Sequence, residues 1–288
     1  MIARAMDGVR PAQVGGPSAQ RTSKRRPRVE MTLAGGFAIE VDGGPVTVPG
    51  PGQRVLAFLA LQRRPVRRVY VCGSLWPDEA EPRSGARLRG ALSRLRGAGL
   101  DVVLAIDDRL QLDPDVIVDV HEIAAATEWL DDPARLPEDC ERWIAALGGE
   151  LLPDWYDEWT PVERERHRQL RLHALEALCR SLTAAGRYLL AIQAGLAAVE
   201  ADALRESAHR ALIRAHLQEG NPSEALRQYR RFRDAVEEEL GIAPTDGMED
   251  LIHAFRPVPH VLANGAHPSH AFARRHRDAQ ATGSVPTA

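Results

Sequence analysis

The 288-residue sequence predicts an α+β domain followed by an all-α domain. Between residues 33 and 112, short strand-like segments precede three amphipathic helices, and a short hairpin follows the helices. This is the order of a winged helix-turn-helix domain. Beyond residue 119 the pattern is helical almost throughout and repeats at an offset of 34 residues, the tetratricopeptide period. The predicted fold is therefore a winged helix-turn-helix domain followed by a tetratricopeptide-like helical repeat domain.

The first part of this pattern consists of short segments bounded by turn-forming residues. Strands are expected at 33–37, 39–41 and 46–48, with Asp42-Gly43-Gly44 as the hairpin signal between the last two. Helices are expected at 53–62, 69–76 and about 83–97. The alternating segments 102–106 and 109–112, joined by Asp107-Asp108, predict the wing hairpin.

The repeat in the second part rests on four pairs of identical residues, each pair 34 positions apart. The pairs are Ala174 and Ala208, Leu178 and Leu212, Gly186 and Gly220, and Ala191 and Ala225. In each copy a glycine ends the first helix, and an alanine five residues later begins the packing face of the second. Two copies do not stack stably alone, so helices of 120–170 are expected to cap them. Trp143, Trp155 and Trp159 are expected in the core of that cap.

The sequence is expected to divide into four parts, of which the first is basic and the third is acidic. A disordered basic leader at 1–30 precedes the winged helix at 31–119, the helical domain at 120–255 and a disordered tail at 256–288. The leader holds seven basic and two acidic residues, whereas 120–255 holds fifteen basic and twenty-six acidic residues. The leader is either a DNA-contacting arm or dispensable, and we favour the second interpretation.

Several functional classes are excluded by missing patterns. No stretch approaches the roughly 18 uncharged apolar residues of a membrane span, and no secretory signal is visible, so a cytoplasmic location without membrane association is expected. Cys72, Cys140 and Cys179 form no CxxC and are interpreted as buried side chains. The sole lysine, Lys24, lies outside any phosphate-binding loop, and no protease, esterase or dinucleotide motif occurs. We expect neither enzymatic activity nor a cofactor or metal, since the scattered tail histidines fit no preorganised site.

The third expected helix carries the candidate binding surface. Leu88, Leu92 and Leu95 fall on one stripe and therefore face the core. No acidic residue occurs between Pro82 and Leu100. A helix with arginines at both edges and small residues between them can enter a major groove, where guanidinium groups reach phosphates or guanine edges. The candidate DNA-binding residues are Arg83, Arg87, Arg89, Ser93, Arg94 and Arg96. A solvated basic face is the less favoured interpretation. Because Asp107 and Asp108 repel phosphate, the wing tip is expected to add little grip.

Four segments carry a resemblance to a known family: QRVLAFLAL, LWPDEAEPRSGARLRGALSRLR, LRESAHRALI and EELGIAP. They resemble the antibiotic regulatory protein (SARP-type) activators of actinobacteria, which contain a bacterial transcriptional activator domain. The resemblance covers about residues 31–252. It implies that Arg87, Arg89, Arg94 and Arg96 contact the groove and phosphates, and that Trp76 and Pro77 are scaffold. It also implies double-stranded promoter DNA with repeated sites, RNA polymerase holoenzyme and a homodimer on DNA as partners. The wing departs from the family, since it carries RLQL in place of a Gly-Tyr element.

Three hypotheses of different classes follow from these patterns. The preferred one is a sequence-specific transcription regulator, with activation as the expected sign. The alternative is an interaction scaffold that does not bind DNA and uses its helical repeats to bind a protein partner. The third is a ligand-responsive regulator whose aromatic run, Trp155, Tyr156 and Trp159, holds a small molecule, although a core role for these residues is favoured.

Overall fold

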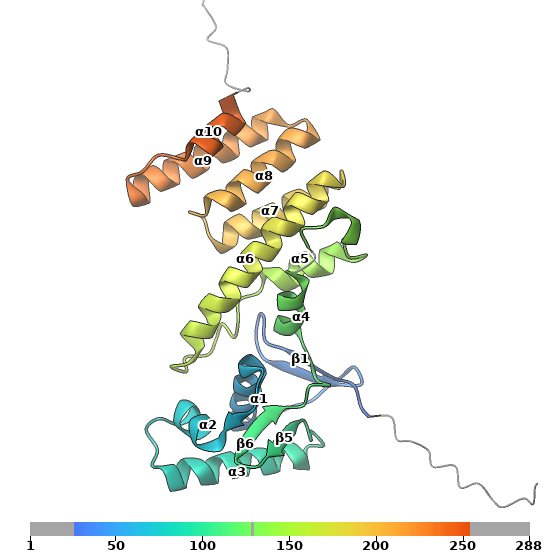
Figure 1. Cartoon of the computed structure of the whole chain (residues 1–288), viewed down its shortest axis with the longest axis vertical. Coiled ribbons are helices and arrows are strands. Elements are labelled where there is room, and N and C mark those ends of the chain that lie inside the picture. Colours follow the sequence, from blue (N-terminus) through green and yellow to red (C-terminus); the bar gives the residue numbers. More distant parts are fainter. Residues whose placement is uncertain (1–25, 128–129, 254–288) are drawn as a thin grey trace, which may run out of the picture.

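The computed structural model describes residues 26–127 and 130–253. An α+β region lies at one end of the molecule and a stack of helices at the other (Figure 1). Most of the predicted leader and the whole of the predicted tail, including the tail histidines, lie outside the described residues. Within the described ranges, no helix has the length and apolar character needed to cross a membrane.

The N-terminal region contains two small sheets and three helices. Its elements are β1 (Val29–Thr32), β2 (Ala38–Val41), β3 (Gly44–Pro45), α1 (Gly50–Gln62), β4 (Val66–Arg67), α2 (Arg68–Leu75), α3 (Glu81–Gly97), β5 (Val103–Ile106), β6 (Arg109–Leu112) and β7 (Ile117–Val118). One sheet has the order β3-β2-β1-β7, and the other has the order β4-β6-β5. The three predicted helices and the wing hairpin β5–β6 are therefore confirmed, as is the fold class.

The predicted first strand at 33–37 is wrong, since β1 ends at Thr32. The carboxylate of Asp119 accepts hydrogen bonds from the backbone N–H groups of Leu33 (3.0 Å) and Ala34 (2.9 Å), which takes these donors away from strand pairing. Gly35 and Gly36 then adopt φ values of 80° and 139°, which end the extended run.

The predicted strand at 46–48 is also largely wrong, because β3 is only Gly44–Pro45. Prolines lack the N–H group that a longer strand would need, and Pro45 and Pro49 flank this segment. The hairpin between β2 and β3 is confirmed. Its two turn residues, Asp42 and Gly43, have φ values of 51° and 79°, as a two-residue turn of the primed type requires.

The helical region begins directly after β7. Its elements are α4 (Asp119–Ala126), a short 3₁₀ turn η1 (Pro133–Arg135), α5 (Cys140–Gly148), α6 (Thr160–Ala184), α7 (Tyr188–Ala201), α8 (Glu206–Glu219), α9 (Pro222–Leu240) and α10 (Asp246–His253). Successive helices from α6 to α9 pack on one another, and α4 and α5 pack against α6 (Figure 1). The prediction that the helices before residue 170 cap the repeats is therefore confirmed.

The predicted repeat is also confirmed. The paired alanines and leucines are completely buried at the α6–α7 and α8–α9 hairpins. Gly186 and Gly220 end the first helix of each hairpin with φ values of 72° and 91°, a left-handed conformation that glycine adopts without a steric penalty. Between the hairpins, a Cβ atom on Gly195 would lie 3.1 Å from the Leu212 side chain, so a glycine allows α7 and α8 to approach closely.

Two of the three tryptophans lie elsewhere than predicted. Trp143 packs on the helical core, but Trp155 and Trp159 pack against the core of the N-terminal region. The Trp155 ring lies 6.1 Å from that of Phe37, and the Trp159 ring lies 5.4 Å from that of Phe58, edge to face. The reason is that residues 149–159 leave the helical stack and return to the sheet, where Gly35 N–H donates to Glu150 O and Leu152 N–H donates to Leu33 O.

Arg164, in the first turns of α6, holds this returning segment in place. Its guanidinium group donates to the backbone oxygens of Leu151 (3.0 Å), Pro153 (3.1 Å) and Trp155, and also to that of Leu152. One side chain thus binds four backbone carbonyl groups of the returning segment. The segment that joins the two cores is therefore fixed to α6 by Arg164 and to the sheet by backbone hydrogen bonds.

Replacing Arg164 with Ala should destabilise the joint between the two regions. Loss of a charged donor that serves several partly buried carbonyls should lower the free energy of unfolding by about 2 to 3 kcal/mol, measured by urea titration. Arg166→Ala on the same helix is the control, since this exposed side chain pairs only with Glu163 at 2.8 Å. The control should change stability by less than about 0.5 kcal/mol. Equal effects of the two substitutions would contradict the role of Arg164.

The fold also buries an imidazole group whose hydrogen-bond partners are uncharged. His209 lies between α8 and α9, where its Nε2 bonds Ala203 O (2.9 Å) and its Nδ1 bonds the Gln228 amide (2.8 Å). Burial lowers the pKa of His209 below its ordinary value. The unfolded chain therefore takes up a proton near pH 6.5 that the folded chain does not take up.

Stability should therefore fall as the pH drops from about 7 towards 5, because protonation near pH 6.5 favours the unfolded state. His209→Gln should make the dependence of the unfolding free energy on pH shallower in this window. The measurement is urea titration at a series of pH values. The control is His253→Gln, which removes an exposed imidazole at the end of α10. The same slope for wild type and His209→Gln would show that His209 does not carry the effect.

Candidate nucleic-acid interface

Helix α3 lies along the outer side of the N-terminal region, at the end of the molecule remote from the helical stack (Figure 1). Leu88, Leu92 and Leu95 are buried against α1 and α2, as the sequence predicts. Ala91 and Ser84 extend this buried stripe. The rotation of α3 about its axis is therefore fixed by its apolar residues, and the polar residues between them face solvent.

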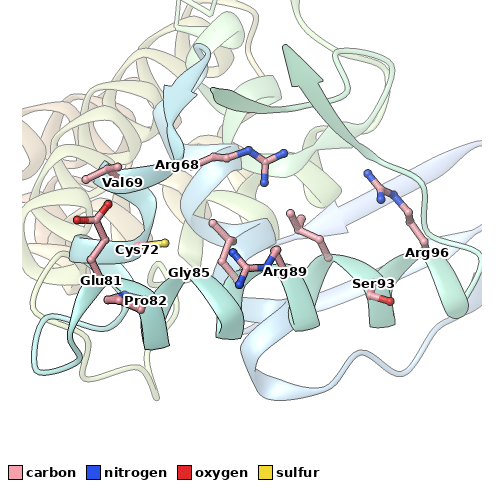
Figure 2. Close-up of a pocket in the computed structure, with 11 residues that line it drawn as sticks. Arg68, Val69, Cys72, Glu81, Pro82, Gly85, Arg89, Ser93 and Arg96 are labelled. Atoms are coloured by element: carbon pink, nitrogen blue, oxygen red, sulfur yellow. The ribbon is translucent and has the colours of Figure 1, made fainter. Parts of the chain in front are cut away.

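All six candidate DNA-binding residues are exposed on the solvent side of α3. The five arginines divide between two edges of the helix, and Ser93 lies between the edges. Arg89, Ser93 and Arg96 line a groove of about 970 Å³ between α2 and α3. Figure 2 shows these residues spaced along α3, with Arg68 of α2 reaching across the same groove.

The opposite edge of α3 carries Arg87, which contacts the scaffold. Its guanidinium group lies over the Trp76 ring, 5.7 Å from the centroid, and pairs with the Glu79 carboxylate. Trp76 itself is buried, which agrees with its predicted scaffold role. Arg87 therefore helps to hold the turn between α2 and α3, in addition to presenting positive charge.

The remaining arginines of α3 differ in their pairing. Arg96 lies 3.4 Å from Asp101, an exposed and weak pair. In the part of the chain that the structure describes, Arg83, Arg89 and Arg94 have no ion-pair partner. Arg94 extends back over Gly90, where an added Cβ would lie 3.4 Å from the guanidinium nitrogen. The solvent face of α3 thus carries arginines without ion-pair partners at its edges and small residues at its centre.

Sequence reasoning missed the contribution of the segment before α2. Arg68 lines the groove opposite α3, and Arg67 in β4 lies beside the wing. The signal was present in the sequence as the run Arg63, Arg64, Arg67 and Arg68. What could not be read from it was the pairing of the two-residue strand β4 with β6, which brings this run next to α3 and the wing.

The wing tip carries less net negative charge than its two aspartates indicate, because an arginine pairs with one of them. Arg67 Nε donates to the Asp108 carboxylate at 2.8 Å, and this hydrogen bond lowers the pKa of Asp108. Asp107 makes no such pair within the described residues and occupies the turn position with φ of 53°. Leu104 and Ile106 of β5 are exposed, so the outer face of the wing is apolar as well as acidic.

The potential metal ligands and the cysteines of the described residues bear on the chemistry that the chain can support. Among them, no group of three or more His, Cys, Asp or Glu side chains could hold a metal ion. All three cysteines are free and buried, as predicted. Burial raises the pKa of Cys72 and raises that of Cys179 to about 12, so neither thiol is activated as a nucleophile.

Comparison with solved structures finds a similar protein. The structure of Mycobacterium tuberculosis EmbR in complex with a low-affinity phosphopeptide has a TM-score of 0.62 and 25% sequence identity. The match covers 79% of the present chain and 64% of the EmbR chain, so the present chain spans less than two thirds of that protein. No curated protein matches the sequence.

A family model supplies the second comparison. The model described as the bacterial transcriptional activator domain matches residues 112–256, which is half of the chain. This range begins at the last residue of β6 and contains β7, both helical hairpins and α10. The chain therefore belongs to the bacterial transcriptional activator domain family of transcription regulators.

Proposed function

We propose that the protein is a sequence-specific regulator of transcription that binds double-stranded promoter DNA through α3. The observation that carries this proposal is the solvent face of α3. Its candidate residues are all exposed, and three of its arginines lack any ion-pair partner within the described residues. The proposed DNA-binding unit comprises residues 31–119, and the proposed regulatory unit comprises residues 120–255.

The proposed roles follow from the two edges of the helix. Arg89 and Arg96 face the groove beside Arg68 and would hold phosphates along one strand. Arg83, Arg87 and Arg94 would lie along the other edge, where a guanidinium group can pair with guanine in the major groove. Ser93 stands between the two edges and can bond either a base or a phosphate.

Helices α6 to α10 are the proposed contact surface for RNA polymerase holoenzyme or another protein, with activation as the expected sign. They lie at the end of the molecule opposite α3, so both surfaces can be used at once (Figure 1). We also propose that the protein binds repeated promoter sites as a homodimer. Its proposed role is binding and not catalysis.

The first test is selection of bound fragments from sheared genomic DNA of the source organism at near-physiological salt, which suppresses non-specific binding. Enrichment of a few promoter fragments that share a repeated element is the expected result. If no fragment is enriched, the protein is not a sequence-specific DNA-binding protein.

Arg89→Ala combined with Arg96→Ala should weaken binding to the selected fragments. If each side chain neutralises one phosphate, the slope of log K against log salt should fall in magnitude by about 0.9 per residue. The matched control is Arg135→Ala combined with Arg142→Ala, which removes two exposed arginines from the helical region. An unchanged salt slope in the α3 variant would show that these arginines do not contact phosphate.

Gly90→Ala separates the stability of α3 from its function. Alanine is the better helix former, so this substitution should raise the free energy of unfolding by up to about 1 kcal/mol. A methyl group at the centre of the exposed face should hold the helix away from base edges and weaken specific binding more than non-specific binding. The measurements are urea titration and DNA titration in parallel. Unchanged specific binding would show that this position does not approach the DNA closely.

A second candidate function, a scaffold that binds protein and not DNA, is favoured by the wing. Its exposed Leu104 and Ile106 and its two aspartates suit a protein surface better than a phosphate backbone. Failure of the fragment selection, with intact folding, would favour this function.

A further inference from the structure

The groove between α2 and α3 has an apolar floor. Its volume of about 970 Å³ lies within the range of sites that hold small organic ligands. Leu88 and Leu92 of α3 and Cys72 of α2 line the groove and are themselves more than nine-tenths buried, so they lie at its bottom. Val69 of α2, which is 61% exposed, continues the apolar surface to the rim.

Two arginines stand over this floor. Arg68 reaches across the groove from α2, and Arg89 lies below it on α3 (Figure 2). Burial raises the pKa of the Cys72 thiol, and the charges of Arg68 and Arg89 act in the opposite direction, so both guanidinium groups lie near this part of the floor. Within residues 26–127 and 130–253, neither side chain has an ion-pair or hydrogen-bond partner. Arg68 and Val69 also belong to the first turn of α2, where the helix dipole adds to the attraction for an anion.

One end of the groove carries a carboxylate. Glu81 lies beside Val69, at the end opposite Arg96 (Figure 2). It is exposed, and the described part of the chain provides no ion-pair partner for it. A DNA backbone would be attracted at Arg89 and Arg96 but repelled at Glu81, and its phosphates gain nothing from an apolar floor. DNA contact therefore does not account for the half of the groove that lies between Glu81 and Arg89.

We propose that this half of the groove binds a small organic acid with an apolar body. The anionic group of the ligand lies between Arg68 and Arg89, and its apolar body lies on the floor towards Val69. A hydroxyl or amino group at the far end of the ligand can donate to the Glu81 carboxylate. The arginines select for the anion, the floor selects for the apolar body, and Glu81 excludes ligands that are negatively charged at both ends.

A ligand in this position also regulates the proposed DNA-binding surface. It occupies Arg89, to which the proposed function assigns a phosphate contact, so ligand and DNA exclude one another. A bound ligand therefore lowers the affinity for DNA, and DNA lowers the affinity for the ligand by the same factor. This consequence rests on the proposed function, whereas the ligand site itself does not.

The experiment is fluorescence titration of the full chain, without DNA, with 8-anilinonaphthalene-1-sulfonate, which joins an apolar body to one anionic group. Saturable binding is the expected result. N-phenyl-1-naphthylamine has the same body without the sulfonate and should bind at least about tenfold more weakly, because it lacks the charged contact with Arg68 and Arg89. Inorganic phosphate lacks the apolar body and should displace the sulfonate only at large excess. Equal binding of the uncharged probe, or displacement by phosphate at concentrations similar to those of the sulfonate, would overturn the inference.

Two variants locate the probe. Val69→Glu places a carboxylate in the groove and should weaken binding of the sulfonate at least about tenfold. Val162→Glu is the matched control, because Val162 is also an exposed valine, at 58%, in the first turn of a helix, α6, and does not line the groove. It should bind the probe as wild type does. A Cβ on Gly85 meets only the Arg89 guanidinium, at 3.6 Å, so Gly85→Leu fills the groove and should also weaken binding.

Thermal melting should show that all variants are folded. A wild type without saturable binding of the sulfonate would overturn the inference, and so would equal binding by Val69→Glu and Val162→Glu. In a separate arm, a promoter fragment obtained by the genomic selection should displace the probe. Retention of the probe at saturating DNA would contradict the competition but not the site, and failure of the genomic selection would leave the titration and its outcome unchanged.

Discussion

The arrangement of the whole molecule depends on the return of residues 149–159 to the N-terminal sheet. Among the described residues, the other joint between the two cores is formed by β7 and α4. There the Asp119 carboxylate binds the backbone at Leu33 and Ala34, and His121 Nε2 bonds Ala60 O. The returning segment adds Trp155 and Trp159 to the N-terminal core. Arg164 at the start of α6 holds the same segment. The direction of α6 is therefore set by the N-terminal sheet, on which this segment docks.

This joint also separates the two charged surfaces of the molecule. The helical stack is built outward from α6, so α9 lies far from α3 (Figure 1). On α3 a buried leucine stripe fixes which residues face solvent, and on α9 Phe232 and Val236 do the same. In both helices packing decides the orientation, and the charged residues take the positions that packing leaves to them.

Much of this organisation could be predicted from the sequence, because it is encoded in local periodicity. The leucine stripe of α3 and the glycines that end α6 and α8 are such signals. What could not be predicted were contacts between segments distant in the sequence. The pairing of β4 with β6 brings Arg68 to the groove, and the docking of Trp155 on Phe37 joins the two regions. Neither contact leaves a periodic signal, because each depends on where the chain returns after a long excursion.

The two charged helices differ in a way that bears on what each can bind. Every charged residue of α3 beyond Glu81 is an arginine, so its face is matched to a polyanion along its whole length. The exposed charges of α9 change sign along the helix, since arginines predominate in its first half and carboxylates in its last turns. A polyanion would therefore be attracted by one half of α9 and repelled by the other. The distinction rests on the order of charges and not on their number, since both faces are rich in arginine.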